Sequence, residues 1–363
     1  MTKTKKPYRR IRVAIVGVGN CASSLVQGVG YVRRYGSEQA GLMRKSIGGI
    51  TPDQVDFVAA FDIDARKVGK PLFEAIYAQP NNTRQLYMVP NDKGPIVMMG
   101  RVLDGVADHM HGGDEAFDVS TAKPVDVARE LRRAKADVVL IYLPVGSEKA
   151  VRWYADQALR AGCALVNCIP VFLTKDAPLM ERFKRRGLPV VGDDIKSQVG
   201  ATIVHRTLAR LFEVRGYRVT KTYQLNVGGN TDFLNMLERS RLASKKVSKT
   251  QSVKSQLPVS DLSPGNIHVG PSDYVPFLRD NKVAFIRLEG VGFCGAPIEI
   301  EARLSVQDSP NSAGVVIDAL RYAFIARERK QGGPLYSACA ACMKSPPKDN
   351  DRDDFELMRE AGR

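Results

Sequence analysis

The sequence has 363 residues, of which 44% are hydrophobic and 26% charged, with a formal net charge of +15 at pH 7. This composition excludes an intrinsically disordered chain, and the length predicts two domains. No apolar run is long enough to span a bilayer, and the run near the N-terminus has no signal-peptide cleavage pattern. With six scattered cysteines, we expect a cytoplasmic protein with reduced thiols.

The positive charge raises the question of a nucleic-acid partner. Nucleic-acid binding favours basic residues clustered with aromatic ones that stack on bases. Here the densest basic run, residues 3–12, holds one aromatic residue, Tyr8, and the other basic residues fall on amphipathic helical patterns. We therefore expect no specific nucleic-acid or membrane partner, and we interpret the surplus charge as serving solubility and an anionic substrate.

The first predicted strand leads directly into a glycine turn. Ile11, Val13, Ile15 and Val16 form an apolar, β-branched run, which Gly17 and Gly19 break. An amphipathic helical pattern begins at Asn20. A strand, a glycine turn and a helix start in this order receive a dinucleotide pyrophosphate. Gly17 allows the tight turn, and Gly19 lets the backbone approach phosphate oxygens. A tight turn in an ordinary α/β protein is the alternative.

The second predicted strand, residues 55–62, ends in an acid. An acid at this strand end hydrogen-bonds the adenosine ribose and disfavours a 2′-phosphate. Asp62 lies 43 residues after Gly19, whereas the usual gap is about 20, so an insertion must separate the two elements. We expect Asp62 to favour NAD over NADP, and Asp64 to cap a helix over residues 65–77.

Strands and helices then alternate, as in a doubly wound parallel sheet. Further strands are predicted at residues 136–142, 163–167 and 188–191. Because turns at the carboxyl ends of parallel strands line a cofactor crevice, we expect residues 143–147 and 167–170 to lie beside the nicotinamide or its ribose. The acid pair Asp193-Asp194 follows the last of these strands at the same edge.

From residue 217 the pattern changes to an alternation typical of antiparallel strands with one exposed face. Such strands are predicted at residues 217–226, 282–288 and 298–306, with helices at 233–243 and 313–327. The chain is therefore predicted to be an α/β protein with an inserted domain. A Rossmann-like doubly wound domain spans residues 1–200 and is completed by 310–363, and an α+β domain spans 201–309.

Eight segments together resemble the myo-inositol-1-phosphate synthase family in its shorter prokaryotic form. They are VGVGNCASSLVQG, LPVGSE, VGDDIKSQVGAT, LNVGGNTDFLNML, SKKVSKT, GPSDYVPFL, DSPNSAGVVIDA and MKSPP, and the resemblance covers residues 10–348. It implies an isomerase that converts glucose 6-phosphate to 1L-myo-inositol 1-phosphate with NAD that ends as it began. It also implies a homotetramer assembled through the α+β domain.

The resemblance explains why lysines matter to this chemistry. A hydride leaves C5, an enolate forms, C6 attacks the C1 aldehyde, and the hydride returns. Each charged intermediate is an oxyanion near a phosphate, which fixed ammonium groups stabilise. The implied catalytic residues are Lys245, Lys249, Lys282, Lys344, Asp194 and Asp308. The resemblance favours Lys245 for proton transfer at the C5 oxygen, whereas the pattern alone would make Lys245 and Lys249 a solvated helix face.

The cofactor site combines the glycine-turn motif with the strand-end turns. The expected NAD-binding residues are Gly17, Gly19, Asn20, Cys21, Ser23, Asp62, Pro144, Gly146 and Ser147. A divalent metal occurs in some members of the family, and Asp193, Asp232 and Asp308 are candidate ligands, although the sequence carries no metal signature. An ordinary NAD-dependent dehydrogenase that releases NADH is the alternative function, but it gives no reason for four lysines in one site.

Overall fold

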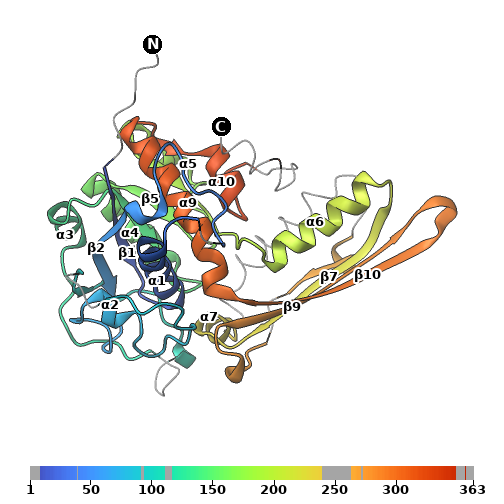
Figure 1. The fold of residues 1–363 in the computed structure, drawn as a ribbon, viewed down its shortest axis with the longest axis horizontal. Coiled ribbons are helices and arrows are strands. Elements are labelled where there is room, and N and C mark those ends of the chain that lie inside the picture. Colours follow the sequence, from blue (N-terminus) through green and yellow to red (C-terminus); the bar gives the residue numbers. More distant parts are fainter. Residues whose placement is uncertain are drawn as a thin grey trace, which may run out of the picture.

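The computed structural model describes residues 9–38, 40–90, 94–110, 117–238, 263–270, 273–348 and 356. In Figure 1 these residues form an α/β body from which a long arm, made of strands β7, β9 and β10 with helix α6 along them, extends to one side. Within the described part of the chain, no helix is both long and apolar enough to cross a membrane.

The body is built on a seven-stranded sheet in which every neighbouring pair is parallel. Its order is β11-β6-β5-β4-β1-β2-β3. The strands are β1 (Ile11–Val16), β2 (Val55–Asp62), β3 (Val97–Met99), β4 (Val138–Ile141), β5 (Ala164–Asn167), β6 (Pro189–Val191) and β11 (Gly333–Pro334). From β3 to β6 this is the 3-2-1-4-5-6 order of Rossmann-like folds, which reverses between β1 and β4. The predicted fold class is confirmed.

Helices cover both faces of this sheet. The main ones are α1 (Asn20–Tyr35), α3 (Val127–Arg133), α4 (Glu148–Ala161), α5 (Ala177–Arg185), α9 (Asp308–Glu328) and α10 (Tyr336–Cys342). Side chains of β1 alternate between two apolar clusters: Ile15 packs with α1, α9 and α10, whereas Val16 packs with α3, α4 and α5. Burial on both faces explains why the parallel strands are apolar throughout.

The arm is a mixed sheet of order β10-β9-β7-β8. Its strands are β7 (Arg218–Gly228), β8 (Ile267–Val269), β9 (Asn281–Val291) and β10 (Pro297–Gln307). β9 runs antiparallel to both β7 and β10, and β8 runs parallel to β7. One face packs against α6 (Ala201–Val214) around Phe212 and Leu288. The three predicted alternating strands are confirmed; β8, only three residues long, was not predicted.

The remaining elements are short. They are helices α2 (Leu72–Ala75) and α7 (Thr231–Asn235) and the 3-10 turns η1 (Pro52–Gln54), η2 (Asp108–Met110), η4 (Pro264–Asn266), η5 (Pro276–Leu278) and η6 (Phe293–Gly295).

Three helix predictions need correction. The helix over residues 65–77 is wrong, because Gly69 has φ +86° and Pro71 follows closely, so only α2 forms. Buried Asp64 accepts the backbone N–H of Arg66 at 2.9 Å and pairs with its guanidinium, but it begins a turn and not a helix. α9 begins five residues before the predicted 313, since Pro310 fits a first helical turn. α7 ends at Asn235, and residues 239–243 of the prediction lie outside the described part.

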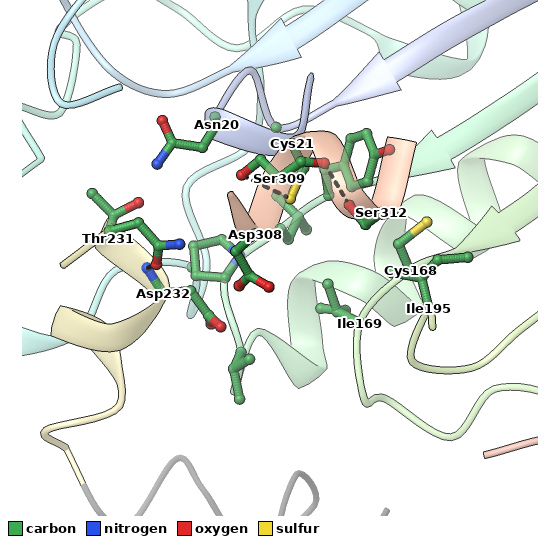
Figure 2. A pocket seen from close by; sticks show the side chains of 18 of the residues that line it. Asn20, Cys21, Cys168, Ile169, Ile195, Thr231, Asp232, Asp308, Ser309 and Ser312 are labelled. Carbon is green, nitrogen blue, oxygen red and sulfur yellow. Dashed lines mark hydrogen bonds between the residues drawn. The ribbon is translucent and has the colours of Figure 1, made fainter. Parts of the chain in front are cut away.

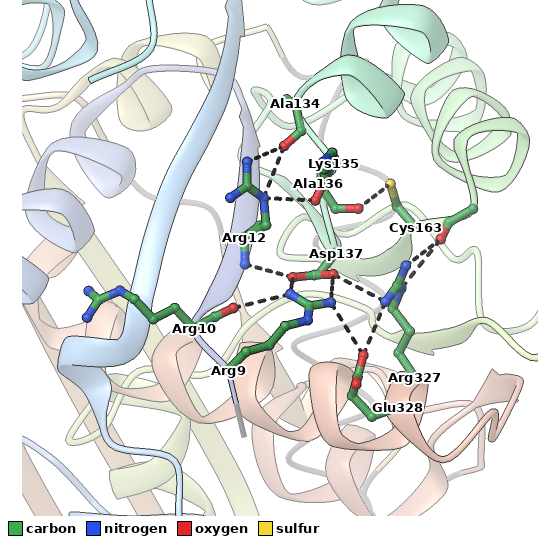
Figure 3. Close-up of polar contacts among 11 residues, drawn as sticks. Arg9, Arg10, Arg12, Ala134, Lys135, Ala136, Asp137, Cys163, Arg327 and Glu328 are labelled. Carbon is green, nitrogen blue, oxygen red and sulfur yellow. Dashed lines mark hydrogen bonds and ion pairs between the residues drawn. The ribbon is translucent and has the colours of Figure 1, made fainter. Parts of the chain in front are cut away.

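A buried carboxylate closes the amino-terminal edge of the sheet (Figure 3). Asp137, 1% exposed, accepts two 2.6 Å hydrogen bonds from Arg9 and one of 2.9 Å from the Arg12 backbone, and it lies 3.2 Å from Arg327. This cluster joins the start of β1, the start of β4 and the end of α9, so the last long helix is tied to the first strand.

Candidate active site

A cavity lies at the carboxyl ends of β1, β2, β4 and β5, where the body meets the second sheet. Its lining includes the glycine turn, the residues after β4 and β5, the start of α7 and the start of α9. Figure 2 shows Asn20 and Cys21 of α1 facing Asp232 and Asp308 from the other side. The cavity is therefore shared by the dinucleotide motif and the mixed sheet, as the Rossmann topology requires for a ligand crevice.

The glycine turn has the geometry that a phosphate needs. Gly17 has φ +91°, and a Cβ there would lie 2.7 Å from the carbonyl oxygen of Tyr142, so no other residue fits. A Cβ on Gly19 would meet no described atom within 4 Å. Among the described residues, no side chain caps α1. The open space before its free N–H groups fits the pyrophosphate of a dinucleotide.

Asp62 joins the end of β2 to this turn. One carboxylate oxygen accepts the Val18 N–H at 2.6 Å, and the other accepts the N–H groups of Ile63 and Asp64 at 2.7 and 2.9 Å. Asp62 also lines the cavity. Its position at the end of the second strand fits the acid that binds an adenosine ribose.

The first lysine–aspartate pair links two distant segments. Lys344 Nζ donates to Asp194 Oδ1 at 2.8 Å, and the Lys344 backbone N–H donates to the Asp194 carbonyl at 2.7 Å. Both side chains line the cavity and are mostly buried. The adjacent Ile195–Met343 bridge is antiparallel, so the acid after β6 and the lysine after α10 are fixed side by side.

The second pair comes from the base of the arm. Lys282, at the start of β9, lies with Nζ 3.3 Å from Oδ1 of Asp308, at the start of α9. Their side chains are 18% and 21% exposed, and both line the cavity. The structure thus brings four of the six predicted catalytic residues together. The other two, Lys245 and Lys249, lie outside the described residues.

Asp280 organises the segments around the second pair. Its carboxylate accepts hydrogen bonds from Thr83 Oγ1 at 2.7 Å, Asn230 Nδ2 at 3.0 Å and Ser309 Oγ at 2.8 Å, and its carbonyl accepts the Asp308 N–H at 2.9 Å. Burial, with the nearby charge of Asp308, raises the pKa of Asp280 to about 6. The Asp280 carboxylate therefore fixes the relative positions of the start of α7, the start of α9 and the loop at Thr83.

The predicted cofactor residues divide into two groups. Gly17, Gly19, Asn20, Cys21, Asp62 and Pro144 line the cavity, whereas Ser23, Gly146 and Ser147 do not. Ser23 is buried and accepts a hydrogen bond from Gln27, and Ser147 donates to the carbonyl of Pro144. Ser23 and Ser147 therefore support the residues that line the cavity and do not line it themselves. Burial raises the pKa of the Cys21 thiol to about 12, so this side chain is neutral.

The three candidate metal ligands are not grouped. Asp193 is fully buried, and its oxygens accept hydrogen bonds from Asn167 and from both N–H and hydroxyl of Thr174; burial raises its pKa to about 7. Asp232 and Asp308 do line the cavity. Among the described residues, no set of three or more His, Cys, Asp or Glu side chains is arranged to hold a metal ion. Of the three candidates, Asp232 and Asp308 are thus placed to contact a cation in the cavity, and Asp193 is not.

Sequence reasoning missed several lining residues: Lys67, Asn81, Tyr154, Gln224 and Asn230. Asn230 caps α7 by accepting the N–H groups of Asp232 and Phe233, and an Asn before a helical pattern is a readable signal. Tyr154, in the middle of α4, has no such signal, because its place in the wall depends on how the helix packs.

The fold and the cavity define an enzyme of the Rossmann-like class with a second, mixed sheet completing the site. A sequence model of the myo-inositol-1-phosphate synthase family matches residues 200–309. The chain is 54% identical to inositol-3-phosphate synthases of Corynebacterium glutamicum, over 93% of this chain and 94% of that one, and of Mycolicibacterium smegmatis, over 93% of each. A crystal structure of a myo-inositol-1-phosphate synthase-related protein from Thermotoga maritima superimposes with a TM-score of 0.81 at 26% identity, covering 98% and 99% of the two chains. The chain belongs to the myo-inositol-1-phosphate synthase family, a family of isomerases.

Proposed function

We propose that the chain converts glucose 6-phosphate to 1L-myo-inositol 1-phosphate with NAD that is restored in each turnover. The observation that carries this proposal is the meeting of two lysine–aspartate pairs, Lys282–Asp308 and Lys344–Asp194, in the cavity that also holds the uncapped start of α1. Family membership supports the same substrate and product.

The residues present fit a dinucleotide along one side of the cavity. The backbone N–H groups from Gly19 to Cys21 would hold the pyrophosphate, Asp62 would hold the adenosine ribose, and the wall around Pro144 would face the nicotinamide. When bound, NAD supplies reversible hydride transfer, which makes the sugar reactive and later restores it.

The paired lysines act on the oxygens of the sugar. Lys282 and Lys344 carry ammonium groups that donate hydrogen bonds, and their aspartates hold each Nζ in place. A fixed cation in a partly buried cavity stabilises negative charge that develops on a carbonyl or enolate oxygen. We assign Lys245 and Lys249 to the same site, with Lys245 transferring the proton at the C5 oxygen.

The test is a product analysis with limiting cofactor. Glucose 6-phosphate in large excess over NAD is expected to give inositol phosphate, followed by 31P NMR, in amounts far above the NAD present. Absorbance at the NADH wavelength should show no net rise. Stoichiometric NADH accumulation would instead identify an ordinary dehydrogenase and overturn the proposal.

We also assign self-assembly into a homotetramer to the second sheet. β10 is an edge strand of 11 residues that pairs only with β9 among the described strands, and long open edges favour pairing with another chain. We also propose that residues 1–200 and 310–363 form one domain and that residues 201–309 form the other. Light scattering on the intact protein tests the homotetramer assignment: a monomeric mass would contradict it.

A further inference from the structure

A fully buried lysine lies in the cavity wall beside the acid at the end of β2. Lys67 is 1% exposed and belongs to the turn that follows this strand, where its N–H donates to the carbonyl of Asp64. It lines the cavity together with Asp62. Lysine is almost never buried without partners, so its surroundings need an explanation that the proposed chemistry does not give.

Lys67 is connected to the glycine turn through a single side chain. Its Nζ donates to Asn81 Oδ1 at 3.0 Å, and Asn81 Nδ2 donates to the carbonyl of Val18 at 3.0 Å. The Val18 N–H in turn donates to Asp62 at 2.6 Å. Lys67, Asn81, the turn and Asp62 therefore form one continuous hydrogen-bonded path around the end of the cavity where the acid lies.

Charged side chains of both signs lie at this end of the cavity. Asp64 is neutralised by Arg66, whose guanidinium donates to both of its carboxylate oxygens at 2.9 and 2.6 Å. The other charged side chains of the cavity lining here are Asp62, the buried Lys67, and Arg101, which is exposed and has its guanidinium 5.7 Å from the centre of the Trp153 ring. Burial lowers the pKa of Lys67, while the charges of Asp62 and then Asp64 act in the opposite direction. Asp62 is thus both the acid of the ribose site and the main counter-charge of a buried cation.

We propose that Lys67 is a second determinant of cofactor choice: a buried cation that Asp62 masks, and that binds the 2′-phosphate of NADP once Asp62 is replaced by a neutral residue. The inference rests on the proposed function, because it takes the cavity to hold a dinucleotide. In the unaltered protein Asp62 occupies this end and repels a phosphate dianion. Without Asp62, Lys67 offers a positive charge where that phosphate lies.

The experiment compares NAD and NADP binding by isothermal titration calorimetry in the intact protein. The variants are Asp62→Ser, Asp62→Ser/Lys67→Gln, and Asp62→Ser/Lys70→Met as the matched control. Glutamine keeps a donor for Asn81 but removes the charge. Lys70 lies three residues further on, and its side chain is 45% exposed and paired with Glu74, so its loss removes one positive charge outside the cavity.

Asp62→Ser is expected to bind NADP more tightly than the unaltered protein by about tenfold to a hundredfold, the range of one hydrogen bond to a charged group. Adding Lys67→Gln should abolish that gain, and adding Lys70→Met should leave it. Because Asp62 also holds the turn, a parallel series built on Asp62→Asn is measured with it, and thermal melting confirms that each variant is folded.

Two failures are distinguishable. Equal NADP affinities in Asp62→Ser and Asp62→Ser/Lys67→Gln, with normal NAD binding by the unaltered protein, would overturn this inference alone. No binding of either dinucleotide by the unaltered protein would overturn the proposed function and this inference with it.

Discussion

Asp194 and Lys344 are separated by 150 positions in the chain, yet they are joined by a 2.8 Å side-chain bond and a 2.7 Å backbone bond. Asp194 sits at φ +63°, a left-handed conformation that only a few residue types adopt readily. The backbone is thus arranged to present this carboxylate to this lysine, which suggests that the pair serves the site and not only the fold.

Replacing Asp194 with Asn should uncouple Lys344 from its partner. We expect kcat to fall by about 10²–10³, the usual cost of misplacing one group that stabilises an oxyanion, while the dissociation constant of NAD changes less than threefold. Asn also tolerates φ > 0, so the turn is kept. Steady-state kinetics and calorimetry measure the two effects. An unchanged kcat would remove the pair from the catalytic group.

The catalytic role of Lys282 can be tested by comparing its replacement with that of another lysine in the same sheet. Lys282→Met removes the ammonium group beside Asp308, and we expect a loss of kcat of about 10² or more. The control is Lys221→Met on β7, where the side chain is 64% exposed and lies 3.7 Å from Glu289. Equal activities for the two variants would contradict the assignment of Lys282.

The two glycines of the turn should respond differently to the same change. Gly17→Ala forces φ +91° on a residue with a side chain and places its Cβ against Tyr142, so we expect a loss of stability of about 1–3 kcal/mol and of NAD binding. Gly19→Ala meets no described atom and should keep its melting temperature.

In Gly19→Ala the added methyl group enters the space assigned to the pyrophosphate. NAD affinity should therefore fall by about tenfold or more in a protein that remains fully folded. Calorimetry and thermal melting on both variants give the comparison. Normal NAD affinity in Gly19→Ala would place the phosphates elsewhere.

Asp280 is expected to act by positioning. Asp280→Ala leaves the donors of Thr83, Asn230 and Ser309 without their acceptor. We expect kcat to fall about tenfold to a hundredfold, with a smaller change in the KM for glucose 6-phosphate, because Lys282 and Asp308 lose their alignment. Asp280→Asn, which retains one acceptor oxygen, should recover part of kcat. No recovery, with a KM that changes as much as kcat, would indicate a purely structural role.

His205 makes a contribution of its own to the pH dependence of stability. Burial lowers its pKa from 6.5 to about 4, and its ring contacts Thr222 Oγ1 at 2.6 Å and Gln224 Oε1 at 3.3 Å. The folded state therefore holds this group neutral, so its contribution is complete above pH 6.5 and is lost as the pH falls toward 4. The loss amounts to about 3 kcal/mol at most.

His205→Gln keeps a polar group but does not titrate. Denaturant unfolding at several pH values should show that the unaltered protein loses stability relative to this variant between pH 6.5 and 4. A constant difference across that range would show that His205 is not the responsible group.

The parallel sheet was predictable because its strands are apolar runs with turn signals at their ends, as for β1 and β4. The site was predictable only in part. Gly17 and Asp62 are determined by local geometry. Asp194 could be placed at the right edge of the sheet because it follows a predicted strand, but its partner Lys344 meets it through the packing of distant segments, and only the resemblance to a family pointed to Lys344. Lys67 and Tyr154 were missed because burial beside a cavity leaves no local pattern in the sequence.

The last long helix also has a consequence for how the protein is made. α9 and α10 complete the apolar layer over Ile15, and the end of α9 reaches Asp137 beneath β1. A ribosome delivers these helices only after about five-sixths of the chain has been synthesised. Until then the part of this sheet face that α9 and α10 cover, beside α1, stays exposed to water, so the nascent body reaches its full stability only when its C-terminal helices are in place.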